Sequence, residues 1–116
     1  MQYAMLIYTD ETQEAQMPKD EHSAMMGQYF AFTNEVKANG NYVTGAPLKP
    51  TQTATSVRLR QGSLLTTDGP FAETKEQLGG FYLLNCKDLD EAIALAAKIP
   101  GAALGTIEIR PVMVFG

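Results

Sequence analysis

Two segments of this 116-residue chain are apolar at consecutive positions rather than at alternate ones. Residues 3–8 read Tyr-Ala-Met-Leu-Ile-Tyr, and residues 80–85 read Gly-Phe-Tyr-Leu-Leu-Asn. A strand with apolar side chains on both sides needs cover on both faces of its sheet. These segments therefore restrict the chain to folds in which a sheet lies between two other layers.

Two helices are predicted between the strands. The first begins near Pro18 and ends at an Asn-Gly pair, residues 39–40, which is typical of a left-handed helix cap. The second begins at a capping box formed by Asp88 and Glu91 and ends at the Pro-Gly pair, residues 100–101. The apolar side chains of the first helix recur at helical spacing at Met25, Tyr29, Phe32 and Val36, with a side stripe at Met26 and Phe30; those of the second are Leu89, Ala92, Ile93, Ala96 and Ile99.

The other strands are shorter. Residues 42–48 form a strand in which Gly45 and Pro47 indicate a bulge or a sheet edge. A Gln-Gly pair between residues 55–60 and 63–67 predicts a hairpin. Residues 106–110 alternate as a last strand, and the polar residues 9–16 are expected to form a loop.

The order strand, helix, strand, hairpin, strand, helix, strand predicts one α+β domain over residues 1–116. It is typical of a ferredoxin-like unit, an antiparallel sheet with two helices on one face and here an extra hairpin. Two helices cover only one face of the sheet. A second copy of the sheet is the simplest cover for the other face, so we expect a homodimer, a dimeric α/β barrel.

Composition excludes several classes of function. The net charge is −4 and the basic residues form no run, which argues against nucleic acid as a partner. No apolar run approaches the ~20 residues that a membrane span needs. Cys86 is the only cysteine, so no intrachain disulfide forms and a reducing, cytoplasmic location is expected. With one histidine, one cysteine and no glycine-rich phosphate loop, we expect no metal site and no cofactor.

The segment between the hairpin and the next strand has an unusual sequence. Residues 68–80 read Asp-Gly-Pro-Phe-Ala-Glu-Thr-Lys-Glu-Gln-Leu-Gly-Gly: a sharp turn, a charged cluster and a glycine pair that permits close backbone approach. This segment resembles the signature of the DGPF branch of the YCII-related domain proteins, and the resemblance extends from Tyr3 to about Pro111. It implies a small ferredoxin-like domain that dimerises, and it implies little about activity.

The candidate site is a polar cleft near this signature. We expect Asp68 to act as a general base or ligand acceptor, and His22, on the inward stripe at the start of the first helix, as a second acid or base in the same pocket. Alternatively, Asp68 caps its own turn and His22 is a half-exposed residue at a helix start. The expected ligand contacts are Gly69, Pro70, Phe71, Glu73, Lys75 and Tyr82. The alternative for Glu73 and Lys75 is mutual ion pairing on a solvated turn.

Three functions fit these residues. The first is a non-catalytic module that binds a small molecule or has a regulatory role; the resemblance suggests such a role, because DGPF domains are often encoded beside extracytoplasmic-function sigma factors. The second is an acid–base enzyme, since some relatives act as lyases or isomerases on small cyclic or chlorinated organic compounds; a dehydrochlorinase-like reaction would use Asp68 and His22. The third is a dimeric scaffold with a vestigial pocket.

Overall fold

The computed structural model describes residues 1–115. Its helices and strands follow the predicted order, with three additional short helices. In chain order they are β1 (Gln2–Thr9), α1 (Glu11–Ala15), α2 (Lys19–Ala38), β2 (Tyr42–Pro47), the 3₁₀ helix η1 (Thr51–Thr53), β3 (Thr55–Arg60), β4 (Ser63–Asp68), β5 (Gln77–Asn85), α3 (Leu89–Ala96), α4 (Gly101–Leu104) and β6 (Thr106–Pro111).

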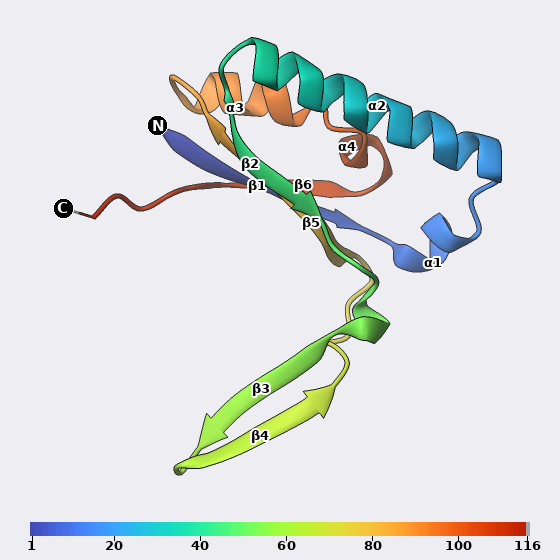
Figure 1. Ribbon diagram of the computed structural model, residues 1–116, viewed down its shortest axis with the longest axis vertical. Coiled ribbons are helices and arrows are strands. Elements are labelled where there is room, and N and C mark those ends of the chain that lie inside the picture. Colours follow the sequence, from blue (N-terminus) through green and yellow to red (C-terminus); the bar gives the residue numbers. More distant parts are fainter. Residues whose placement is uncertain (116) are drawn as a thin grey trace.

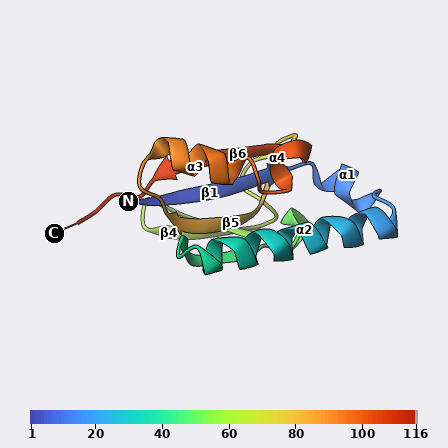
Figure 2. The ribbon, with the colours of Figure 1, turned by 90° about the horizontal axis from the view of Figure 1, so that it is seen from above.

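Four strands form one antiparallel sheet in the order β2-β5-β1-β6. The two consecutive-apolar segments are its central strands, with Met5 opposite Tyr82. β2 lies at an edge, as Gly45 and Pro47 indicated. Helices α2 and α3 lie on one face of this sheet (Figures 1 and 2). The predicted ferredoxin-like α+β class is therefore confirmed.

The core lies between this face and the helices. The most deeply buried side chains are those of Met5, Val36, Leu84 and Ile99. On α2 the predicted stripe is correct, because Met25, Phe32 and Val36 are buried. On α3 it is partly wrong: Leu89 and Ile93 are exposed, because the helix packs the side that carries Ala92, Leu95 and Ala96 against the sheet.

The predicted loop at residues 9–16 is wrong, because α1 forms there. The carboxylate of Asp10 accepts hydrogen bonds from the backbone N–H groups of Thr12 and Gln13, which caps the helix. The side chains of Glu11 and Gln77 then hold α1 in place: Glu11 N–H donates to Gln77 Oε1, and the Glu11 carboxylate accepts from Thr51. No helix within residues 1–115 is long and apolar enough to cross a membrane.

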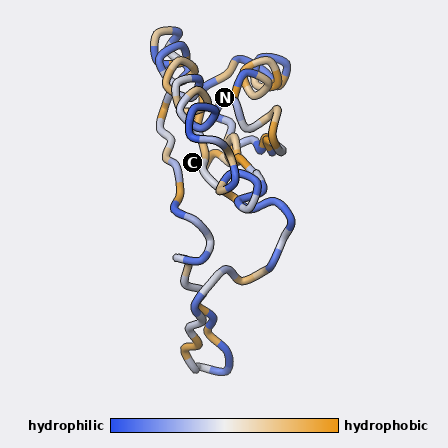
Figure 3. The backbone as a smooth tube through the Cα atoms, turned by 90° about the vertical axis from the view of Figure 1, so that its right-hand side faces the viewer, coloured by the Kyte–Doolittle hydropathy of each residue, from blue (hydrophilic) through white to orange (hydrophobic). Residues whose placement is uncertain are grey.

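The opposite face of the sheet carries the second apolar set of the central strands. Neither α2 nor α3 lies on this side, which we call the open face (Figures 1 and 3). By strand alternation it carries the partly exposed side chains of Ala4, Leu6, Tyr8, Phe81 and Leu83. The sequence predicted that a second layer covers these residues, and the described part of the chain does not supply that layer. The homodimer therefore stays a prediction.

Strands β3 and β4 form a separate two-stranded sheet, the predicted hairpin. Gln61 and Gly62 both have positive φ, 50° and 78°, as a two-residue hairpin turn requires. The hairpin projects from the body on the side opposite α2 and α3, that is, on the side of the open face (Figures 1 and 3). We call residues 55–68 the arm.

Candidate functional site

A cleft of about 410 Å³ lies between α2 and the β2–β5 edge of the sheet. Its walls are mainly apolar and aromatic, in contrast to the polar cleft that the sequence predicted. Residues of α2 line one side, and residues of β2 and β5, glycines among them, line the other. Its lining residues are Ile7, Thr9, Glu14, His22, Met25, Met26, Tyr29, Phe30, Thr33, Tyr42, Gly45, Ala46, Pro47, Leu48, Gly79, Gly80, Phe81 and Tyr82.

Tyr82 brings a hydroxyl group to this cleft. Its oxygen lies 2.8 Å from Thr33 Oγ1, so the two hydroxyls share a hydrogen bond across the sheet–helix interface. The ring packs edge-to-face on Phe32, with the centroids 5.1 Å apart, and near Tyr42 at 6.5 Å. The contacts with Phe32 and Tyr42 restrain the Tyr82 ring. The hydroxyl groups of Tyr82 and Thr33 therefore form a polar pair with a defined position in an otherwise apolar wall.

Two tyrosines of the cleft, Tyr29 and Tyr82, are held in the protonated form. Burial raises the pKa of Tyr29 to about 12, and the carboxylate of Glu14 contributes in the same direction. Burial also raises the pKa of Tyr82, although the hydrogen bond with Thr33 opposes this effect. Near neutral pH both phenols therefore keep their protons and do not act as bases.

Glycines of β2 and β5 allow close approach of these two strands beside the cleft. A Cβ at Gly45 would lie 2.9 Å from both Phe81 O and Tyr82 Cδ1, so the Tyr82 ring occupies space that any other residue would need. A Cβ at Gly80 would lie 3.0 Å from Ala46 O. Gly80, the second glycine of the pair that ends the signature, therefore serves close strand approach, as the sequence indicated; a Cβ at Gly79 would lie 3.9 Å from Thr9 Oγ1, an ordinary contact.

Two ionisable side chains besides the tyrosines line the cleft. His22 lies on the first turns of α2 and is exposed at the cleft rim. Glu14 comes from α1, which the sequence did not predict. An imidazole can donate, accept or exchange a proton, so His22 is the candidate acid or base at this cleft.

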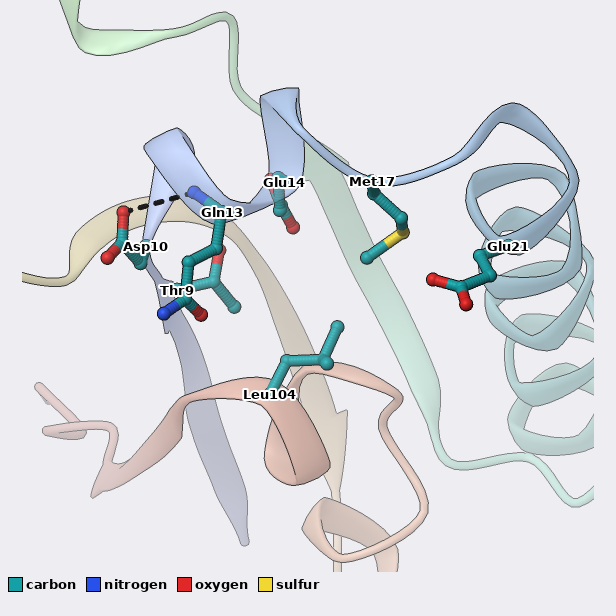
Figure 4. Close-up of a pocket in the computed structure, with 7 residues that line it drawn as sticks. All are labelled: Thr9, Asp10, Gln13, Glu14, Met17, Glu21 and Leu104. Carbon is teal, nitrogen blue, oxygen red and sulfur yellow. Dashed lines mark hydrogen bonds between the residues drawn. The ribbon is translucent and has the colours of Figure 1, made fainter.

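A smaller cavity of about 200 Å³ adjoins the cleft (Figure 4). The two share Thr9 and Glu14. Figure 4 shows that α1 and the start of α2 supply acidic side chains around this cavity, with Leu104 of α4 below. Within residues 1–115 no three His, Cys, Asp or Glu side chains are grouped so as to hold a metal ion.

The signature turn lies at the root of the arm. Gly69 has φ +98°, its N–H donates to Ala54 O at 2.7 Å, and its carbonyl accepts from Ser56 Oγ. The sharp turn is therefore as predicted. The Asp68 carboxylate is exposed and makes no hydrogen bond with residues 1–115, so the turn is held without it.

Most of the predicted ligand contacts lie outside both cavities. None of residues 68–77 lines the cleft or the smaller cavity, and the Phe71 side chain is 81% exposed. The structure brings His22 and Tyr82 to the cleft and leaves Asp68, Gly69, Pro70, Glu73 and Lys75 elsewhere on the chain. No ion pair joins Glu73 to Lys75 in the described residues; the one present there links Lys98 to Glu35.

The model of the YCII-related domain matches residues 1–116, the whole chain. The chain belongs to the YCII-related domain family. An uncharacterised protein of Rhizobium meliloti (strain 1021) is 38% identical over 117 residues, which covers 99% of this chain and 94% of that protein.

One solved structure of similar fold comes from Burkholderia phenoliruptrix AC1100. It is 5-chloro-2-hydroxyhydroquinone dehydrochlorinase in complex with 2,5-dihydroxybenzoquinone, with a TM-score of 0.53 and 12% identity over 97% of this chain and 94% of that one. At this identity the likeness concerns the fold alone, and it agrees with the ferredoxin-like architecture of this YCII-related domain.

Sequence reasoning missed most of the cleft of this YCII-related domain. Thr33 lies one residue beyond Phe32 on α2, and only knowledge of the helix position over β5 pairs it with Tyr82. The side stripe Met26 and Phe30 was the available signal, since apolar residues beside a buried stripe indicate a partly covered groove.

Proposed function

We propose that this YCII-related domain binds a small, largely apolar molecule bearing hydroxyl or carbonyl groups in the cleft between α2 and the β2–β5 edge. One observation carries the proposal: an apolar, aromatic cleft of about 410 Å³ contains a restrained pair of hydroxyls, Tyr82 and Thr33. Small-molecule sites commonly have this volume and this combination of apolar walls with few polar groups.

The chemistry of the walls narrows the ligand class. Tyr29 and Tyr82 remain protonated donors, which suits a carbonyl or hydroxyl oxygen. Phe30 and Tyr42 offer aromatic surface to a planar ring. The ligand named with the neighbouring structure, 2,5-dihydroxybenzoquinone, is a ring of this kind and supports the class without specifying the compound.

Ligand binding can serve either regulation or catalysis. A regulatory module needs only the cleft, and the cleft is what the structure supports best. The acid–base enzyme is the second candidate, because His22 lies at the cleft rim and the fold is shared with a dehydrochlorinase. In that case His22 is the catalytic acid or base, and Asp68 of the same chain is not among the cleft residues.

The test uses hydroquinone and 2,5-dihydroxybenzoquinone as probes in isothermal titration. We expect Tyr82→Phe to weaken binding about fivefold, because one hydrogen bond contributes about 1 kcal/mol. Tyr3→Phe is the matched control: Tyr3 is also buried, but its hydroxyl contacts Met1 Sδ outside the cleft. Equal affinities for all three proteins, or no binding of either probe, would contradict the proposal.

A second assay separates enzyme from binding module. This assay measures chloride release from a chlorinated hydroquinone. The enzyme would be supported if the native protein releases chloride and His22→Gln does not, while His22→Gln still binds the probes with the native affinity. Tight binding without turnover would support the regulatory module.

We further propose that the domain forms homodimers across the open face and works in the cytoplasm, where its free Cys86 thiol stays reduced.

A further inference from the structure

The arm, residues 55–68, has two different faces. Because side chains alternate along each strand, Val57 and Leu59 of β3 share one face with Leu64 and Thr66 of β4. We call this the apolar arm face. The other face carries Arg58, Arg60 and Leu65. The three apolar side chains of the apolar arm face are each more than 60% exposed.

An isolated two-stranded hairpin is only marginally stable in water. In the arm, nearly every side chain is exposed, and Ser56 near the root is the exception among the residues of the two strands. Such a hairpin is unfavourable as a free arm, because its two strand edges expose unpaired backbone groups that favour strand pairing and its exposed leucines favour aggregation. The arm therefore requires a partner surface.

The direction of the arm indicates where that surface lies. The arm leaves the body on the side of the open face, away from α2 and α3 (Figures 1 and 3). A second copy stacked on the open face would place its sheet about 10 Å below the first sheet, within the space on the arm's side of the molecule. With six residues in each strand, the arm reaches about 20 Å.

The area that a stable dimer needs supports the same partner. Four strands spaced ~4.8 Å apart and about six residues long give the open face a flat area on the order of 400 Å². A stable dimer buries about 800 Å² on each partner. By the same spacing, one face of the arm adds on the order of 200 Å². The surface covered by the arm of the second copy adds on the order of 200 Å² more, so each partner reaches the area that a stable dimer needs.

We propose that the arm is a dimer clasp: its apolar face, Val57, Leu59 and Leu64, docks on the second copy that covers the open face. This inference rests on the homodimer proposed above. Asp68 shares the apolar arm face at the root, opposite Thr55, so a docked arm also turns this carboxylate toward the partner subunit. The signature turn then serves to set the direction of the arm.

The test compares two matched leucine substitutions on opposite faces of the arm. Leu59→Glu changes the apolar arm face, and Leu65→Glu changes the other; the two side chains are 64% and 48% exposed, so neither contributes to the core. Sedimentation equilibrium across a dilution series gives the dimer Kd. We expect Leu59→Glu to raise it at least tenfold and Leu65→Glu to change it less than threefold.

Hydrogen exchange supplies the second readout. We expect the backbone amides of β3 and β4 to exchange slowly above the dimer Kd and quickly below it, because a free hairpin opens easily. A native protein that is monomeric would overturn both the homodimer and the clasp. A dimer that Leu59→Glu and Leu65→Glu affect equally, or arm protection that does not depend on concentration, would overturn the clasp and leave the homodimer standing.

Discussion

Alkaline pH should weaken the fold through Tyr29, and Tyr29→Phe should remove that weakening. The pKa of Tyr29 is raised from 10.0 to about 12, first by burial and then by the carboxylate of Glu14. An acid whose pKa is higher in the folded state favours folding at low pH. Its contribution is complete below pH 10, where both states keep the proton, and it is lost as pH rises from 10 to about 12.

The magnitude follows from the shift. Each pKa unit corresponds to about 1.4 kcal/mol, so two units set a ceiling of about 2.7 kcal/mol. Tyr29 is only partly buried and solvent screens its charge, so we expect a loss of about 1–2 kcal/mol. Phenylalanine keeps the ring and removes the titrating group.

Urea unfolding at pH values from 8 to 11.5 measures this difference. The gap in free energy of unfolding between the native protein and Tyr29→Phe should be constant up to pH 9.5 and then shrink or reverse. Parallel curves for the native protein and Tyr29→Phe would refute the claim that the folded protein holds this phenol protonated.

Two glycines give further predictions. Gly45→Ala should cost about 1–3 kcal/mol in urea unfolding and should also weaken hydroquinone binding, because the new Cβ meets Phe81 O and displaces the Tyr82 ring at the cleft; undiminished binding would contradict that view of the wall. Gly69→Val should cost about 1–3 kcal/mol because φ is +98° with open space around it, so the penalty comes from backbone conformation alone. Gly27→Ala, in open space on α2, is the control and should stabilise the protein by about 0.5–1 kcal/mol. Similar free energies of unfolding for all three variants would refute the roles given to Gly45 and Gly69.

The fold could be predicted from the sequence wherever one short-range pattern determines one element. The consecutive apolar residues of β1 and β5 indicated two strands, which lie at the centre of the sheet, and the Gln-Gly pair indicated the hairpin. The capping box was correct in Asp88, which accepts from Glu91 N–H at 2.9 Å. Glu91 differs in detail: its carboxylate accepts from Lys87 N–H, one residue before the expected one.

The site could not be predicted to the same degree, because it depends on how α2 lies over the sheet edge. Tyr82 and Thr33 are 49 residues apart, and no local pattern pairs them. The signature drew attention to Asp68 and Phe71 because it is unusual, whereas its Gly79 and Gly80 are the residues that reach the cleft. The polar segment before α2 was predicted to be a loop, and so Glu14 was missed.

The central claim is that ligands bind between α2 and the β2–β5 edge. Two-dimensional ¹H–¹⁵N NMR with hydroquinone as the titrant tests it most directly. We expect the largest shift changes at the amides of Gly45, Gly80 and Tyr82 and of the α2 residues near Thr33, which line the cleft. Changes confined to residues 68–77 of the signature, with the cleft amides unmoved, would contradict the account.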